Sequence, residues 1–182
     1  IVARDAQHAD ALNGRATTLL ALGRLAEAID AYARAVAAAP QCAELHYNLG
    51  NALQQRGDLV AARAAYRQAI ARSPQFAEAQ LEIAHCALSA GDFAAGWPAY
   101  EWRWKTAQMR DCRLPDAAPP WLGAPALARK TILVWAEQGA GDTLQFVRLV
   151  PRLLARAGRV ILRVQAPLRR LVESLDARIA VI

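Results

Sequence analysis

The feature that most constrains this chain is a pattern that returns every 34 residues. Glycines, tyrosines and prolines keep this spacing along the first hundred residues, at Gly23, Gly57 and Gly91, at Tyr32, Tyr66 and Tyr100, and at Pro40 and Pro74. A period of about 20–50 residues is the signature of repeat architectures, in which each unit packs on its neighbours. The sequence therefore predicts an array of similar structural units.

Each unit divides at its glycine into two amphipathic helices. In residues 43–76 the apolar and small residues recur at helical spacing on both sides of Gly57, as His46, Leu49, Gly50 and Leu53, and then as Leu59, Ala62, Tyr66, Ala69 and Ile70. Gly57 suits the left-handed conformation that ends a helix, and Asp58 can cap the helix that follows. Pro74 cannot continue that second helix. Each unit is therefore predicted to be a helical hairpin.

These positions resemble the tetratricopeptide repeat (TPR), whose spacing is met in the second copy by Leu49, Gly50, Leu53, Ala62, Tyr66, Ala69 and Pro74. A first copy, 9–42, keeps most of the pattern, and a third copy, 77–104, departs from it at Gly96 and Arg103. The resemblance implies an α-helical solenoid of three hairpins, preceded by a short remnant at 1–8.

By the same resemblance, the first helix of each hairpin lines a groove that holds a protein or peptide. The expected groove residues are Asn13, Thr17, Tyr47, Asn51, Gln54, Leu81 and His85. No Lys or Arg occurs among the groove positions, which disfavours the clamp by which some repeats of this kind grip acidic C-termini. A polar, slightly acidic surface fits an extended peptide held by amide hydrogen bonds. The simpler interpretation of His85 alone is a structural or solvated side chain.

The chain is basic only in its second half. Residues 1–104 hold nine Arg and ten acidic residues, whereas residues 105–182 hold thirteen Lys or Arg and six acidic residues. The arginines are scattered with few aromatic residues among them, so we expect a solvated basic face and no nucleic-acid partner. No uncharged apolar run approaches the roughly 20 residues that span a bilayer, so no membrane association is expected.

The three cysteines, Cys42, Cys86 and Cys112, are an odd number without metal-ligand spacing. We expect buried, reduced thiols, no metal site and a cytoplasmic location.

Aromatic residues crowd the end of the third repeat. Helical spacing places Phe93, Trp97, Tyr100 and Trp104 along one face, whose two related interpretations are an internal aromatic core and a docking surface. Pro98 predicts a kink, or a restart of the helix at Trp97. Residues 105–130 then lose all periodicity and carry four prolines, which predicts a connector.

Beyond the connector the period changes to that of an α/β unit. Strands are expected at 131–136, 160–164 and 178–182, and helices at 142–157 and 167–175. This βαβαβ order predicts a small Rossmann-like unit, half of a doubly wound parallel sheet. Its unfinished edge at 178–182 is the segment that we expect to pair with a second copy of the chain.

A glycine loop, Gly139 and Gly141, joins the first of these strands to its helix. Such loops open backbone amides toward ligands at the strand ends. The pattern departs from the dinucleotide fingerprint because Leu144 stands at the third glycine position and no acid follows the second strand. No Walker lysine is present either, so no cofactor is expected.

The segment 130–168 resembles the opening of the first lobe of GT-B glycosyltransferases of the heptosyltransferase type, through Gly141, Asp142 and Pro151. The preceding Trp-rich stretch resembles the junction in bacterial proteins that join TPRs to such a lobe and are likened to O-linked N-acetylglucosamine transferases. The resemblance implies that 131–182 is a partial GT-B lobe and that Asp142 is the candidate base for the acceptor hydroxyl. The alternative role of Asp142 is that of a helix N-cap.

Two hypotheses follow for function. In the first, the chain is the substrate-recruiting array and the start of the acceptor lobe of a protein glycosyltransferase, inactive by itself because the nucleotide sugar is held mainly by a second lobe of the parent protein. In the second, it is a non-enzymatic TPR scaffold. Protein binding is expected in both.

Overall fold

The computed structural model describes residues 2–109, 119–123 and 126–182, with side chains from His8 onward. The chain divides into two compact units, residues 1–113 and 114–182, which we call the helical unit and the sheet unit. Much of the predicted connector, 110–118 and 124–125, lies outside the described residues, as does Cys112.

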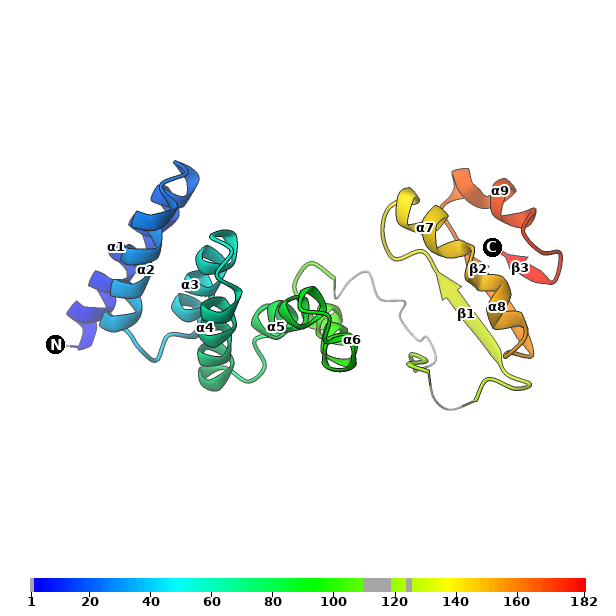
Figure 1. Cartoon of the computed structure of the whole chain (residues 1–182), viewed down its shortest axis with the longest axis horizontal. Helices are drawn as coiled ribbons and strands as arrows, with labels where there is room; N and C mark the ends of the chain where they lie inside the picture. Colours follow the sequence, from blue (N-terminus) through cyan, green and yellow to red (C-terminus); the bar gives the residue numbers. More distant parts are fainter. Residues whose placement is uncertain (1, 110–118, 124–125) are drawn as a thin grey trace. The chain divides into compact units, whose positions relative to one another are not determined.

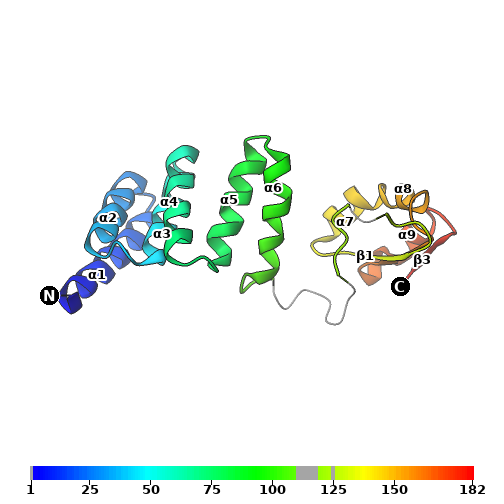
Figure 2. The same ribbon diagram turned by 90° about the horizontal axis from the view of Figure 1, so that it is seen from below.

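The helical unit consists of three helix pairs in succession. Helix α1 (Val2–Ala21) pairs with α2 (Leu25–Ala38), α3 (Ala43–Gln55) with α4 (Leu59–Arg72), and α5 (Ala77–Ser89) with α6 (Phe93–Tyr100). Helices of neighbouring pairs also pack, α2 on α3 and α4 on α5, as the order in Figures 1 and 2 shows. The helical unit is a solenoid, as the 34-residue period predicts.

The turns within the pairs form for the reasons that the sequence suggests. Gly23, Gly57 and Gly91 take positive φ angles of 73°, 88° and 79°, the left-handed region that glycine enters at no steric cost. Asp58 and Asp92 then accept hydrogen bonds of 3.1 Å from the backbone N–H groups of Ala61 and Ala95. These aspartates satisfy amides that the first turns of α4 and α6 would otherwise leave unpaired.

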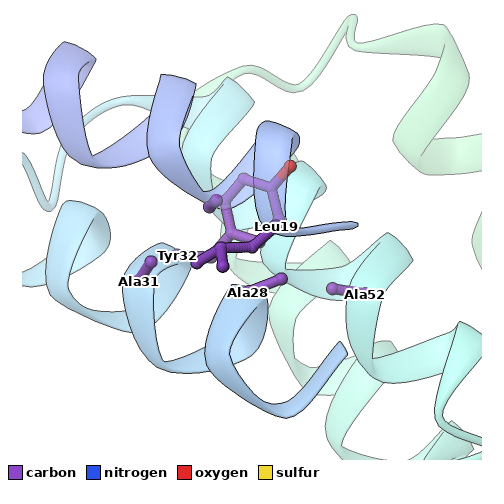
Figure 3. Close-up of a cluster of buried hydrophobic side chains, with 6 residues drawn as sticks. Leu19, Ala28, Ala31, Tyr32 and Ala52 are labelled. Carbon is purple, nitrogen blue, oxygen red and sulfur yellow. The ribbon is translucent and has the colours of Figure 1, made fainter. Parts of the chain in front are cut away.

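A buried tyrosine of the second helix joins the two helices of a pair. Tyr32 lies between α1 and α2 among Leu19, Ala28 and Ala31, with Ala52 of the next pair beside them (Figure 3). Tyr66 is 0% exposed, and a Cβ atom added at Gly50 would lie 2.6 Å from its Cδ1 atom. Small residues therefore allow α3 and α4 to approach closely, with the phenol ring filling the space that remains.

The last helix corrects two predictions. Helix α6 begins at Phe93 and continues through Pro98 to Tyr100, without a restart at Trp97, and then tightens into the 3₁₀ helix η1 (Glu101–Lys105). A proline removes one backbone hydrogen bond, and here the helix ends within a turn of that loss. Phe93 and Trp97 are 58% and 57% exposed, so the aromatic residues do not form a wholly internal core in the structure.

The sheet unit contains three parallel strands in the order β1 (Thr131–Trp135), β2 (Arg159–Arg163) and β3 (Ile179–Val181). Helices α7 (Ala140–Val147) and α8 (Val150–Leu154) connect β1 to β2, and η2 (Ala166–Leu168) with α9 (Arg169–Glu173) connects β2 to β3. Val160 and Leu162 of β2 share one face of the sheet and pack against side chains of α7, α8 and α9. Leu133 points from the alternate face and is 36% exposed.

The bounds predicted for the first helix of this unit, and Asp142 as its alternative N-cap, are wrong. The predicted helix 142–157 begins at Ala140 and is divided into α7 and α8, with a turn at Arg148 and Leu149 between them. Its N-cap is Gly139, so Asp142 is not the cap and lies in the first turn instead. The carboxylate still interacts favourably with the positive end of the helix dipole.

The Gly50 contact makes a testable prediction about stability. Replacing Gly50 with Ala forces a Cβ atom into the buried Tyr66 ring, and we expect the free energy of unfolding to fall by about 1–3 kcal/mol. The control is Gly14→Ala in exposed α1, where an added Cβ meets nothing within 4 Å and helix propensity adds about 0.5–1 kcal/mol. Urea unfolding followed by circular dichroism measures both; equal effects would contradict the packing argument.

Candidate functional site

The first helices of the three pairs form a continuous surface, which we call the first-helix face and define by the outward side chains of α1, α3 and α5. Side chains on this face bond from one pair to the next. Asn48 Nδ2 on α3 donates to Asn13 Oδ1 on α1 over 3.0 Å, and Gln54 Nε2 donates to Glu82 Oε2 on α5 over 3.2 Å. These bonds fix the mutual positions of the three helices that a peptide would contact.

Three of the predicted groove residues occupy one repeat position and contact the tyrosine of their own pair. The Thr17 hydroxyl lies 3.1 Å from the Tyr32 hydroxyl, and Tyr66 donates to Asn51 Oδ1 over 2.9 Å. In the third pair the His85 and Tyr100 rings have centroids 5.7 Å apart. This position therefore links the first-helix face to the buried tyrosine of the first two pairs and to the partly buried Tyr100 of the third.

A hollow of about 340 Å³ lies between α3 and α5 on this face. Its lining residues are Tyr47, Asn51, Gln54, Gln55 and Glu82. Two rings pack against the Tyr47 ring, whose centroid lies 5.0 Å from that of Phe76 and 5.9 Å from that of Tyr66. The Tyr66 hydroxyl also lies 2.6 Å from Gln54 Oε1, so its single hydrogen is shared between the two amide oxygens that it holds in place.

The only carboxylate among the lining residues belongs to Glu82. His85 Nδ1 lies 3.4 Å from Glu82 Oε2, the oxygen to which Gln54 donates. The hydrogen bond from His85 is the main reason that the pKa of Glu82 is lowered, and the same bond raises the pKa of His85. Burial raises the pKa of the Tyr47 hydroxyl, which stays neutral at pH 7. The hollow therefore carries a negative charge near neutral pH.

The first helices taken together are acidic, whereas most arginines of the second helices lie on α4. From His8 onward the first helices α1, α3 and α5 carry Asp10, Glu44, Glu78 and Glu82 against a single cation, Arg15. The second helices reverse this balance, with Arg34, Arg63, Arg67 and Arg72 against Glu27 and Asp30. The first-helix face thus attracts cations even though the helical unit as a whole is nearly neutral.

The structure brings four of the seven predicted groove residues into this site. Tyr47, Asn51 and Gln54 line the hollow, and His85 borders it through Glu82. Asn13 and Thr17 lie farther along the face on α1, and Leu81 is half-buried on α5. The sequence analysis missed Glu82 and Gln55 as lining residues. The available signal was that Glu82 stands 34 residues after Asn48, which bonds across the same face.

The glycine loop of the sheet unit is held by a residue that the sequence analysis did not select. Gln165, just beyond β2, donates from Nε2 to the Gln138 carbonyl over 2.7 Å and accepts a 3.0 Å bond from the Thr143 hydroxyl. Gly139 and Gly141 are exposed, and so is Asp142, whose carboxylate makes no hydrogen bond or ion pair with the described residues. The predicted loop residues thus lie together at the carboxyl end of β1.

Within the described residues, no three His, Cys, Asp or Glu side chains gather in a way that would hold a metal ion. In the same part of the chain no helix is long and apolar enough to cross a membrane.

Comparison with known proteins identifies the helical pattern. A family profile described as TPR repeat matches residues 17–57, and the tetratricopeptide repeat profile matches 43–76. Residues 17–76 carry tetratricopeptide repeats. No curated protein sequence matches the chain.

Solved TPR structures have the same fold. The second TPR of Spaghetti (RPAP3) bound to the HSP90 peptide SRMEEVD is 21% identical, with a TM-score of 0.52 over 54% of this chain and 92% of that chain. The TPR2B domain of yeast Sti1 in its complex with pHsp70 is 21% identical, with a TM-score of 0.53 over 58% of this chain and 85% of that chain. MamA is 22% identical, with a TM-score of 0.53 over 58% of this chain and 62% of that chain.

The Glu82–His85 pair on the first-helix face makes the stability of the fold depend on pH. The raised pKa of His85 stabilises the fold below its ordinary value of 6.5, and this contribution is lost as pH rises through the folded-state pKa. The lowered pKa of Glu82 stabilises the fold above 4.5, and this contribution is lost as pH falls through its folded-state pKa. The pair therefore stabilises the fold most between pH 4.5 and 6.5.

We expect Glu82→Gln to lower the pKa of His85 and to remove this pH-dependent contribution. The effect on stability stays below about 1 kcal/mol, because the His85 side chain is 41% exposed and solvent screens the pair. NMR titration of the His85 ring signals measures the pKa, with the ring of His8 on α1 as the internal control. An unchanged His85 titration in the variant would contradict the assignment of the pair.

Proposed function

We propose that the helical unit binds an extended peptide along the first-helix face. The observation that carries the proposal is the cross-bonded row of amide, hydroxyl and carboxylate groups from Asn13 to Glu82, with the hollow beside Tyr47. Side chains already fixed by hydrogen bonds lose little conformational entropy when a ligand binds, which favours affinity. The similar TPR structures that hold an HSP90 peptide and pHsp70 support this mode of binding.

The preferred peptide differs in charge from the one in the RPAP3 structures. Their peptide, SRMEEVD, has an acidic C-terminal end. The first-helix face described here has four acidic residues against Arg15, so it repels such an end. We therefore expect a neutral or basic peptide, and no clamp on a terminal carboxylate.

Selection from a displayed library of random dodecapeptides on the 182-residue chain tests this function. We expect enriched peptides whose affinity falls at least tenfold in Leu81→Arg, since the arginine protrudes from α5 into the peptide's path. The matched control is Val60→Arg on α4, where the residue is 83% exposed on the opposite side of a pair and adds the same charge. Equal losses in the two variants, or the absence of any enriched peptide, would contradict a peptide-binding first-helix face.

We also propose that the sheet unit is the beginning of a GT-B-like acceptor lobe in a larger bacterial protein glycosyltransferase. Support comes from the three adjacent parallel strands and from the exposed glycine loop at the carboxyl end of β1, where open α/β sheets bind their ligands. Asp142 is exposed beside that loop, as a base for an acceptor hydroxyl must be. A non-enzymatic scaffold remains the alternative function for the same peptide-binding unit.

The Asp142→Asn variant of the full-length protein tests the enzymatic proposal. We expect transfer of sugar from a nucleotide sugar to a bound peptide to slow by about 10²–10⁴-fold, the usual contribution of a general base, with peptide binding unchanged. Mass spectrometry of the peptide measures transfer, and Glu173→Gln on exposed α9 is the control for loss of a surface charge. Undiminished transfer by the Asp142 variant would exclude this residue as the base, and no transfer by the unaltered protein would favour the scaffold.

A further inference from the structure

The hollow between α3 and α5 has the dimensions of a site for one side chain. Its volume of about 340 Å³ lies at the lower end of the range of roughly 300–1,000 Å³ found for small-molecule pockets. It lies on the first-helix face, where the proposed peptide would run, so a side chain from that peptide can enter it without a change in the helices. This inference therefore rests on the proposed peptide-binding function and specifies it.

The lining groups select the charge of the side chain. Glu82 is the only ionisable carboxylate of the hollow, and its Oε2 atom already accepts from Gln54 and His85. Among the described residues no donor reaches its other oxygen, Oε1. A carboxylate oxygen that is partly buried and without a donor is stabilised by a cationic donor from a ligand.

The other lining groups favour the same ligand chemistry. The Tyr47 ring, which packs against Phe76 and Tyr66, has a π-system that attracts cations. Gln55 adds an exposed amide at the rim whose oxygen can accept a further hydrogen bond. No Lys or Arg lines the hollow, and His85, the titratable base that bonds to Glu82, contacts Oε2 and leaves Oε1 to a ligand.

We propose that this hollow is a specificity site for an arginine or lysine side chain of the bound peptide, which pairs with Glu82 beside the Tyr47 ring. Gln54 and Asn51, both held by Tyr66, position the walls of the site. The peptide is thereby recognised through a basic residue at one fixed position, in contrast to recognition of an acidic C-terminus.

The dodecapeptide library used for the proposed function also tests the inference. We expect the peptides enriched by the unaltered chain to share Arg or Lys at one position, and replacement of that arginine with neutral, isosteric citrulline to lower affinity at least tenfold. Glu82→Gln should lose the discrimination between arginine and citrulline while it still binds the citrulline peptide. Glu82→Lys should enrich Asp or Glu at the same position.

The control separates a defined site from the general charge of the face. Glu44→Gln removes the same charge from exposed α3 outside the hollow, and the variant should keep the preference for arginine. An equal loss of discrimination in the Glu44 and Glu82 variants would overturn the proposed site. Enriched peptides without a shared basic position would overturn it too and leave peptide binding intact, whereas no enrichment at all would overturn both.

Discussion

The helical unit depends on the packing of one tyrosine per pair against the first helix of the same pair. Tyr66 is fully buried, its ring occupies the space that Gly50 leaves, and its hydroxyl bonds to Asn51 and Gln54. A buried phenol needs a partner for its hydroxyl, and the partners available are polar groups of the first helix. The contact that closes the pair therefore also fixes the side chains that face a ligand.

This coupling explains which sequence predictions succeeded in the helical unit. The hairpins are predictable because turns and caps are local: Gly57 takes φ 88°, and Asp58 caps the helix that begins one residue later. The positions that form the first-helix face are predictable, because a residue on this face in one repeat has an equivalent at the same place in the next repeat. Pro98 does not restart the helix at Trp97, because the amide hydrogen that it lacks falls near the end of α6.

The geometry of the site depends on contacts between residues that are far apart in the sequence, which a local sequence pattern does not reveal. The hollow exists because Gln54 reaches Glu82, which lies 28 residues farther along the chain on another helix. In the sheet unit Gln165 bonds to Gln138, 27 residues earlier, and so holds the loop before α7. The N-cap rule selected Asp142 for its side-chain oxygen, whereas the N-cap of α7 is Gly139, whose backbone carbonyl accepts from the Thr143 N–H group. Such pairs require knowledge of which helices and strands become neighbours.

The charge of the helical unit is unevenly distributed among its helices, which the net charge does not show. Acidic residues dominate α3 and α5 and arginines dominate α4, so a basic peptide is attracted to these first helices and repelled by α4. The field is contributed by many exposed groups and weakens with salt, and it acts mainly on the rate of encounter. Discrimination between individual peptides instead requires a partly desolvated group at short range, because only there is the attraction poorly screened. On the first-helix face that group is Glu82, positioned by Gln54 and His85, so selectivity for a basic residue depends on the hydrogen bond from Gln54 that joins α3 to α5 and on the contact with His85 within α5.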